Sequence, residues 1–179
     1  MLLFWNRGYE ATSMRDLTEA TGMTPPSLYA AFGDKKRLFL EAVDRYLAGP
    51  GQYARRAFSE EPTAERAIRR LLMDTVDAFC DPSRPKGCMV VLAATNCTAE
   101  SADILSALAD RRRLMERAVR DRIAAGRAAG ELEPGADINV LTGLVVTTLY
   151  GLSLKARDGA SRSSMRKIVT QIMRAWPSA

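Results

Sequence analysis

Apolar residues recur at helical spacing along most of this chain, and they predict a set of α-helices rather than a sheet. After Thr63, the apolar positions 68, 71, 72, 76 and 79 fall on one face of a helix that runs to about Cys80. A long helix is predicted from Ser101 to about Ala129, and an apolar one from Asp137 to about Ala156. The last helix begins at Ser161 or Ser163 and carries its apolar stripe to Trp176.

The segment 87–94 is apolar on every side, so its pattern does not separate a strand from a helix. Met89 to Leu92 is rich in residues that favour strands. No other segment offers a strand with which it could pair, so we predict a short buried helix. The predicted fold class is therefore all-α.

Residues 13–46 have the layout of a helix-turn-helix unit. Ser13 is placed to cap a first short helix, and Gly22 stands where the end of that helix needs a left-handed residue. Thr24 can cap a second short helix, in which Pro25 and Pro26 occupy the first turn, where a missing N–H is tolerated.

The second short helix is expected to bury one side and expose the other. Leu28, Ala31 and Phe32 are predicted to face inward, which leaves Ser27 and Tyr29 outside. Gly33 and Asp34 end this helix and open a third one at Lys35. The glycine- and proline-containing stretch 49–51 then reads as a linker, which predicts domains at residues 1–48 and 52–179.

This stretch resembles the DNA-binding domain of the TetR/AcrR family of bacterial repressors. The resemblance is carried by anchors at fixed spacing over residues 3–46: Phe4, Gly8, Tyr9, Thr12, Ser13, Leu17, Gly22, Ser27, Leu28, Tyr29, Phe32, Lys35, Leu38 and Phe39. It implies an all-helical homodimer that binds double-stranded operator DNA and is released by a small-molecule inducer. It also implies an N-terminal three-helix unit followed by a larger ligand-binding and dimerisation domain.

The resemblance assigns DNA contacts to eight positions, which are Thr12, Ser13, Thr24, Pro25, Pro26, Ser27, Tyr29 and Lys35. Thr24 and Ser27 can also be explained as caps alone, and Tyr29 as part of the packed edge of the unit. The second helix offers few side chains for bidentate base contacts, so sequence preference is expected to depend on Ser27, on thymine methyl groups and on DNA shape. The chain begins about midway along the first helix of such a domain, which predicts a natural start upstream of Met1 or the loss of residues there.

The same resemblance places a ligand pocket inside the larger domain. Its candidate lining residues are Met73, Val76, Phe79, Val91, Leu92, Thr95, Leu108, Met115, Leu144, Thr148 and Tyr150. These groups would suit a hydrophobic molecule. The alternative for each of them is a place in a packed core.

The last two helices are more apolar than a single neighbouring layer can cover, so a dimer interface is expected there. Its candidate residues are Leu141, Val145, Leu152, Met165, Ile168, Val169, Ile172, Met173 and Trp176. Two copies of each helix would form a four-helix bundle, although both helices could also complete the core of one chain.

Charge and composition narrow the function only in part. The formal net charge is +5, but residues 1–47 contain six basic and six acidic residues, so net charge gives no argument for DNA binding. The chain contains no histidine, which removes Ser-His and Cys-His catalysis and mixed Cys/His metal sites. No enzyme, metal or cofactor is therefore predicted, and the alternative function is a helical ligand-binding protein whose helix-turn-helix no longer binds DNA.

Two sequence features bear on the cellular location, namely apolar segments that could span a membrane and signals for secretion. Residues 138–154 come closest to a membrane span, but polar residues interrupt them, so a buried helix is expected. No secretory signal is recognised, which predicts a cytoplasmic protein. Cys80, Cys88 and Cys97 are read as buried apolar residues, with a thiol sensor as the alternative.

Overall fold

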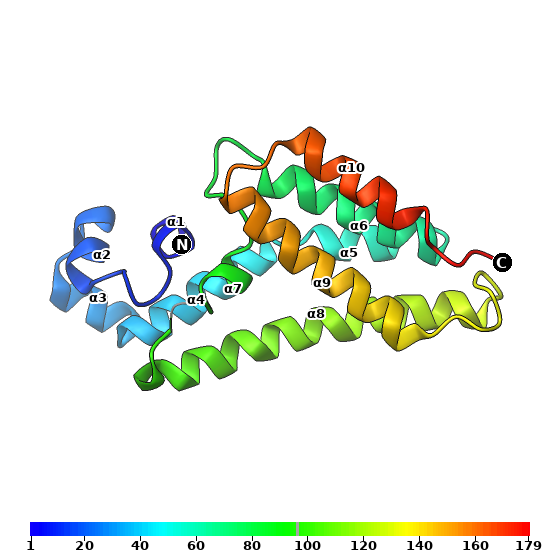
Figure 1. The fold of residues 1–179 in the computed structure, drawn as a ribbon. Helices are drawn as coiled ribbons and strands as arrows, with labels where there is room; N and C mark the ends of the chain where they lie inside the picture. Colours follow the sequence, from blue (N-terminus) through cyan, green and yellow to red (C-terminus); the bar gives the residue numbers. More distant parts are fainter. Residues whose placement is uncertain (96) are drawn as a thin grey trace.

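The computed structural model describes residues 1–95 and 97–179, and within them the fold is all-helical, as predicted. Four helices form one end of the molecule: α1 (Leu2–Arg7), α2 (Met14–Thr21), α3 (Pro25–Phe32) and α4 (Lys35–Ala48). Figure 1 shows that this end lies far from the C-terminus. The helix α4 runs from it toward the larger domain.

The predicted caps explain where these helices begin and end. Ser13 and Asp16 form a reciprocal capping box at the start of α2, and Gly22 closes that helix in the left-handed conformation at φ 68°. The Thr24 side chain accepts a hydrogen bond from the Ser27 amide at the start of α3. Asp34 does the same for α4 by accepting from the amide of Arg37.

Aromatic residues hold the N-terminal unit together. Phe39 on α4 packs edge-on against Phe4 and Tyr9, with ring centroids 5.1 and 5.2 Å away. Trp5 packs in the same manner against Tyr46 at 4.7 Å. Because α1 supplies two of these rings, it anchors α4 in the core of the unit.

The larger domain is built around α6 (Ala64–Phe79), which contacts α5 (Tyr53–Glu60), α8 (Ala102–Ala128), α9 (Ile138–Arg157) and α10 (Arg162–Met173). The short helix α7 (Met89–Leu92) lies between the N-terminal unit and α8, and one 3₁₀ turn, Ala99–Ser101, precedes α8. Eight residues of α6 are buried, including the whole stripe that the sequence predicted.

Two outcomes concern the predicted elements. Residues 89–92 form the short helix that was predicted, and the described residues contain a single isolated bridge, between Leu132 and Ser178, rather than a strand. The helix α5 was not predicted. It spans only two turns between a Gly-Pro-Gly segment and Glu61-Pro62, too short for its periodicity to stand out.

The two parts of the chain are joined on both sides of the N-terminal unit. On the α1 side, the Trp5 indole donates to the carbonyl of Gly87 at 3.0 Å, and Arg157 on α9 donates to the carbonyl of Asn6. On the α4 side, Lys36 and Asp44 pair with residues of α8. The N-terminal unit is therefore tied to the larger domain at several points.

Gly87 is required by this junction. Its φ is 77°, and a Cβ placed on it would lie 2.6 Å from the carbonyl oxygen of Ser153. The Ser153 hydroxyl also accepts a hydrogen bond from the amide of Cys88 at 2.8 Å. Glycine thus allows the loop before α7 to approach α9 closely.

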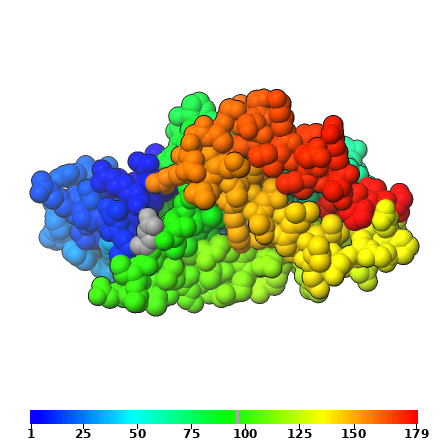
Figure 2. All heavy atoms as spheres, in the orientation of Figure 1, coloured from blue at the N-terminus to red at the C-terminus, as the bar shows by residue number. Residues whose placement is uncertain are grey.

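The helix α9 is long and apolar enough to cross a membrane, a property that core helices of soluble proteins share. Eight of its residues are buried against the rest of the chain. Figure 2 shows α9 and α10 next to each other on one face of the molecule. The prediction of a buried apolar helix over this segment is therefore met on one side of α9 only, because the other residues of the helix remain partly or fully exposed.

Candidate DNA-binding surface, dimer face and ligand cavity

The helix α3 presents its first turn to solvent. Leu28 is buried and Phe32 half-buried, whereas Pro25, Pro26 and Ser27 are exposed. The expectation that Ala31 faces inward was wrong, since it is exposed. An eight-residue helix held by one deeply buried leucine leaves most of its circumference free to meet a ligand.

Hydroxyl groups are concentrated at the start of α3. The Oγ atoms of Thr24 and Ser27 lie 2.9 Å apart and share a hydrogen bond. Thr24 is thus both the cap of the helix and an exposed polar group at its N-terminus. Amides at a helix N-terminus and adjacent hydroxyls are the groups that bind phosphate oxygens.

Tyr29 and Lys35 extend this surface. Tyr29 is 49% exposed, so its ring is not part of the packed edge. Lys35 is half-buried, and its Nζ lies 4.3 Å from the centroid of the Tyr9 ring. Burial lowers the pKa of Lys35. The Lys35 ammonium therefore sits on an aromatic platform at the start of α4.

The two candidates before α2 differ from each other. Ser13 is exposed, and hydrogen bonds from its side chain and amide, with Arg7 nearby, lower the pKa of Asp16 to about 2. Thr12 is fully buried, and its hydroxyl donates to the carbonyl of Gly8 at 2.7 Å. The expected phosphate contact of the Thr12 side chain is therefore corrected, because that hydroxyl is used inside the turn.

Lys36, the next residue on α4, also has a partner in the larger domain. It pairs with Asp103 at the start of α8. Eight residues further along both helices, Arg111 on α8 pairs with Asp44 on α4 at 2.8 Å. The two ion pairs link α4 to α8 at two positions along their length.

The candidate dimer residues of α9 and α10 are largely used within one chain. Leu141, Val145 and Leu152 on α9 are at most 8% exposed. On α10, Met165, Val169 and Met173 are buried, and this helix packs on α6. Ile168, Ile172 and Trp176 are half-buried and remain at the surface.

A different face of α9 is free. Val140, Leu144 and Leu154 are 66%, 43% and 54% exposed. Gly143, Thr147 and Gly151 are exposed between them, at the spacing of one helical stripe. The sequence missed this face because α9 is apolar nearly all round, so its periodicity did not distinguish inward positions from outward ones.

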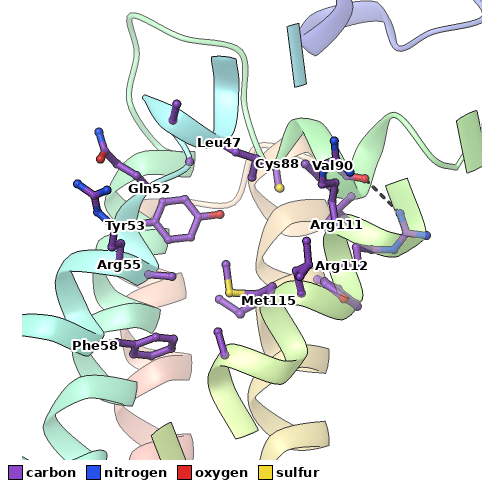
Figure 3. A pocket seen from close by; sticks show the side chains of 18 of the residues that line it. Leu47, Gln52, Tyr53, Arg55, Phe58, Cys88, Val90, Arg111, Arg112 and Met115 are labelled. Atoms are coloured by element: carbon purple, nitrogen blue, oxygen red, sulfur yellow. Dashed lines mark hydrogen bonds between the residues drawn. The ribbon is translucent and has the colours of Figure 1, made fainter. Parts of the chain in front are cut away.

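A cavity of about 730 Å³ opens between α5 and α8. Figure 3 shows Tyr53 and Phe58 projecting from α5 toward Met115 on α8, with Cys88 between the two helices. The end of α4 contributes Leu47 and Ala48 to its wall. The last turn of α4, which belongs to the N-terminal unit, therefore borders the cavity directly.

Four of the eleven predicted pocket residues line this cavity: Phe79, Val91, Met115 and Tyr150. The other seven do not. Val76 and Leu108 are fully buried in the core, Leu144 and Thr95 are exposed, and the remaining three are half-buried outside the lining: Met73, Leu92 and Thr148. The helix α5, which the sequence pattern did not predict, contributes the largest share of the missed lining, followed by α8.

Two tyrosines of the cavity have raised pKa values. Burial raises the pKa of Tyr53 well above its ordinary value, and burial also raises the pKa of Tyr150. Both phenols are therefore protonated at neutral pH and can donate hydrogen bonds. Arg111 and Arg112 line the same space from α8, and Arg112 donates to the carbonyl of Val90 at 3.3 Å.

The cysteines do not form a common site. Cys88 is buried at the cavity, and Cys80 and Cys97 are half-buried elsewhere. Burial raises the pKa of Cys97, which lowers its thiolate fraction. Within the described part of the chain, no group of three or more His, Cys, Asp or Glu residues is arranged to hold a metal ion.

Comparison with known proteins identifies this architecture. Residues 1–42 match the family described as "Bacterial regulatory proteins, tetR family". Residues 64–176 match "Tetracyclin repressor-like, C-terminal domain". The chain belongs to the TetR family. Together the two matches cover both the helix-turn-helix and the larger helical domain of this TetR-family protein.

Relatives of known name agree with this assignment. The HTH-type transcriptional repressor ComR of Escherichia coli K12 is 34% identical over 178 residues, which are 99% of this chain and 85% of ComR. A cysteine mutant of the TetR family transcriptional regulator CifR, complexed with 26-bp double-stranded operator DNA, is 41% identical with a TM-score of 0.94. That match covers 98% of this chain and 92% of the CifR chain.

A third comparison extends to another bacterium. A TetR transcriptional regulator from Rhodococcus sp. RHA1 is 37% identical with a TM-score of 0.66, covering 99% of this chain and 94% of the other. These relatives are transcriptional regulators rather than enzymes. The TetR-family chain described here is accordingly a transcriptional regulator, and the resemblance first indicated by residues 3–46 is confirmed.

Proposed function

We propose that this protein is a homodimeric repressor that binds operator DNA through α3 and is released by a small molecule bound between α5 and α8. One observation carries the proposal. The helix α4 completes the DNA-reading unit at its N-terminal end, and its last turn borders the cavity through Leu47 and Ala48. A ligand in the cavity would therefore touch the helix that positions the DNA-reading end.

The DNA contact is assigned to the exposed side of the helix-turn-helix. Ser27, Tyr29 and the two prolines would face the major groove, with Thr24 and Ser13 at phosphates and Lys35 at the backbone. The operator complex of the CifR variant, with its TM-score of 0.94, supports this orientation. Because the unit carries equal numbers of acidic and basic residues, affinity would rest on local contacts rather than on net charge.

Two copies are needed to read two half-sites. The free stripe of α9 at Val140, Leu144 and Leu154 supplies an apolar surface that water otherwise covers. Pairing this stripe with its copy about a twofold axis would bury both. The two α3 helices would then reach half-sites about 34–36 Å apart, one turn of DNA.

Release would follow from a change in the angle between α4 and α8. The pairs Lys36–Asp103 and Asp44–Arg111 join these helices, and both are partly exposed to solvent. Such pairs contribute little to stability, so the free energy of ligand binding can change them. A ligand that prefers the altered spacing of the two α3 helices shifts the population away from the DNA-binding state.

The decisive experiment begins with selection of bound duplexes from random DNA, followed by anisotropy titrations at several salt concentrations. Lys35→Ala should weaken binding to all duplexes by a similar factor, because Lys35 is assigned to phosphate. Ser27→Ala should instead change the ranking of duplexes that differ at single base pairs. Lys167→Ala, an exposed lysine on α10, is the matched control.

The results separate the two candidate functions. Salt-dependent binding to a selected duplex, with unequal effects of the two substitutions, supports repression. Equal effects would contradict the roles assigned to these residues. Failure to select any duplex would favour the alternative, a helical ligand-binding protein without DNA-binding activity, which the formally neutral segment 1–47 leaves open. A repressor of bacterial operators acts in the cytoplasm, and we place this protein there.

A further inference from the structure

Every titratable side chain that lines the cavity is either a hydrogen-bond donor or a cation. Tyr53, Tyr150 and Cys88 bring two phenols and a thiol, and α8 brings Arg111 and Arg112. None of the described lining residues is Asp or Glu. A molecule in this space would meet donors and cations but no side-chain carboxylate.

The two arginines of α8 have different partners. Arg111 is neutralised by Asp44, whose carboxylate lies 2.8 Å from its Nη2. No carboxylate of the described residues lies within ion-pair distance of Arg112, which donates only to the neutral carbonyl of Val90. Figure 3 shows this bond, and it shows the guanidinium of Arg55 pointing away from the cavity. Among the described residues, Arg112 is thus a lining cation without an ion-pair partner, and Glu116, whose charge helps to raise the pKa of Tyr150, is not one of the residues that line the cavity.

Arg112 carries a guanidinium cation, and its side chain is half-buried. A guanidinium that is partly removed from water gains more from an anion than it would in bulk solvent. A second cation would be repelled, and a neutral guest would cover the guanidinium without pairing its charge. The charge of Arg112 therefore favours anionic ligands over neutral and cationic ones.

Most of the remaining lining residues are apolar, and several of their side chains are large. Leu47 from α4, Phe58 from α5, Phe79 from α6 and Met115 from α8 surround a volume of about 730 Å³. This lies within the range of about 300–1,000 Å³ that is typical of sites for organic ligands. Such a volume is too large for an inorganic anion alone and is suited to a guest with an apolar body.

We propose that the ligand of this cavity is an amphipathic anion, whose apolar body lies between α5 and α8 and whose carboxylate or sulfonate head binds Arg112 beside the Tyr150 hydroxyl. The inference rests on the proposed ligand-responsive function and names the chemical class of the ligand. It also connects to release, because Arg111, the neighbour of Arg112 on α8, already holds Asp44 of α4. An anion arriving beside Arg111 would compete with Asp44 for that guanidinium.

A matched pair of dyes provides the test. Anilinonaphthalene sulfonate and N-phenylnaphthylamine share the same aromatic body, but only the first carries an anionic group. Both become fluorescent in apolar sites, so titration of the intact protein gives a Kd for each. The variants are Arg112→Met, Arg112→Lys and, as a control, Arg113→Met, which removes an exposed arginine that pairs with Asp110 outside the cavity.

The anionic dye should bind wild-type protein more tightly than the neutral one. Arg112→Met should weaken the sulfonate dye by about tenfold or more, as expected for loss of a charge-assisted hydrogen bond, and should change the neutral dye by less than about twofold. Arg112→Lys should recover part of the loss, and Arg113→Met should change neither Kd. Ala118→Trp, which adds a large side chain at an exposed lining position, should weaken both dyes.

Several results would overturn the inference. They are equal binding of both dyes to wild-type protein, an equal loss of both in Arg112→Met, sulfonate binding that Ala118→Trp does not affect, and no binding of either dye. The proposed function is scored separately by operator affinity. If the neutral dye releases operator DNA while the anion does not, the ligand class is wrong but ligand-responsive repression stands.

Discussion

The exposed stripe on α9 makes a sharp prediction about dimerisation. Leu144 is 43% exposed in the single chain, whereas Leu152, two turns further along the same helix, is 2% exposed. If the stripe forms the interface, Leu144→Glu should dissociate the dimer while leaving the core of each subunit intact. Because Leu152 is buried within one chain, we expect a change there to lower the stability of the subunit rather than that of the dimer.

The magnitude follows from the area that remains to be buried. Full burial of a leucine side chain is worth roughly 1.5–3 kcal/mol, so the exposed fraction of Leu144 contributes about 1 kcal/mol in each copy. Twofold symmetry doubles this to about 2 kcal/mol, which is a factor of about 30 in the dimer Kd. Placing two carboxylates near the axis adds repulsion, so about 30-fold is the minimum expected.

Sedimentation equilibrium over a range of protein concentrations measures this Kd directly. Leu114→Glu is the matched control, because Leu114 is 52% exposed but lies on α8 at the cavity. It should leave the dimer Kd unchanged. Leu152→Ala should instead lower the free energy of unfolding by about 2–5 kcal/mol, as for other large-to-small changes in a packed core.

The reasoning would be refuted if Leu144→Glu stayed dimeric with the wild-type Kd. It would also be refuted if Leu114→Glu dissociated the dimer to the same extent, since the interface would then involve α8 rather than the α9 stripe. Far-ultraviolet circular dichroism of both variants keeps the comparison interpretable, because it shows that each remains helical.

Three further predictions concern the N-terminal unit and its junction. Gly87→Ala should lower the free energy of unfolding, measured with denaturant, by about 3 kcal/mol or more. The reason is that residue 87 has a φ of 77° and that a Cβ there would lie 2.6 Å from the carbonyl oxygen of Ser153. A loss below about 1 kcal/mol would show that this loop can move to accept a side chain. Asp16 has a folded pKa of about 2, below its ordinary value of 3.8, so its stabilising effect is present above pH 4 and lost as pH falls toward 2. The stability difference between wild type and Asp16→Asn should shrink over that window, and a difference independent of pH would contradict the capping role. Thr12→Val should lower the free energy of unfolding by about 1–2 kcal/mol, because the Gly8 carbonyl loses its hydrogen-bond donor. The salt dependence of DNA binding should stay unchanged. A smaller salt dependence would show that Thr12 contacts a phosphate after all.

Much of the fold could be predicted from the sequence because its signals are local. Ser13, Thr24 and Asp34 cap helices as expected, since capping involves residues three positions apart. The long stripe of α6 was visible because it repeats over four turns. The helix α5 escaped because two turns bounded by prolines and glycines carry too few repeats to stand out.

The candidate site was only partly predictable, because it is assembled from helices distant in sequence. Tyr53, Val90 and Arg112 meet at one cavity although they come from α5, α7 and α8. Nothing in the spacing of the sequence relates these residues to one another. The position of Arg112 at the cavity emerged only from the packing of α7 against α8.

The amino-acid sequence by itself determined the helix-turn-helix, the all-helical fold class and the family of this protein, because each rests on short-range patterns or on anchors at fixed spacing. Tertiary structure decided which face of α9 is free and which groups line the cavity. It also decided that the Thr12 hydroxyl is buried and donates a hydrogen bond to the carbonyl of Gly8. The physical reason is that burial depends on the neighbours that long-range packing supplies. A helix that is apolar all round carries no internal mark of which side those neighbours will cover.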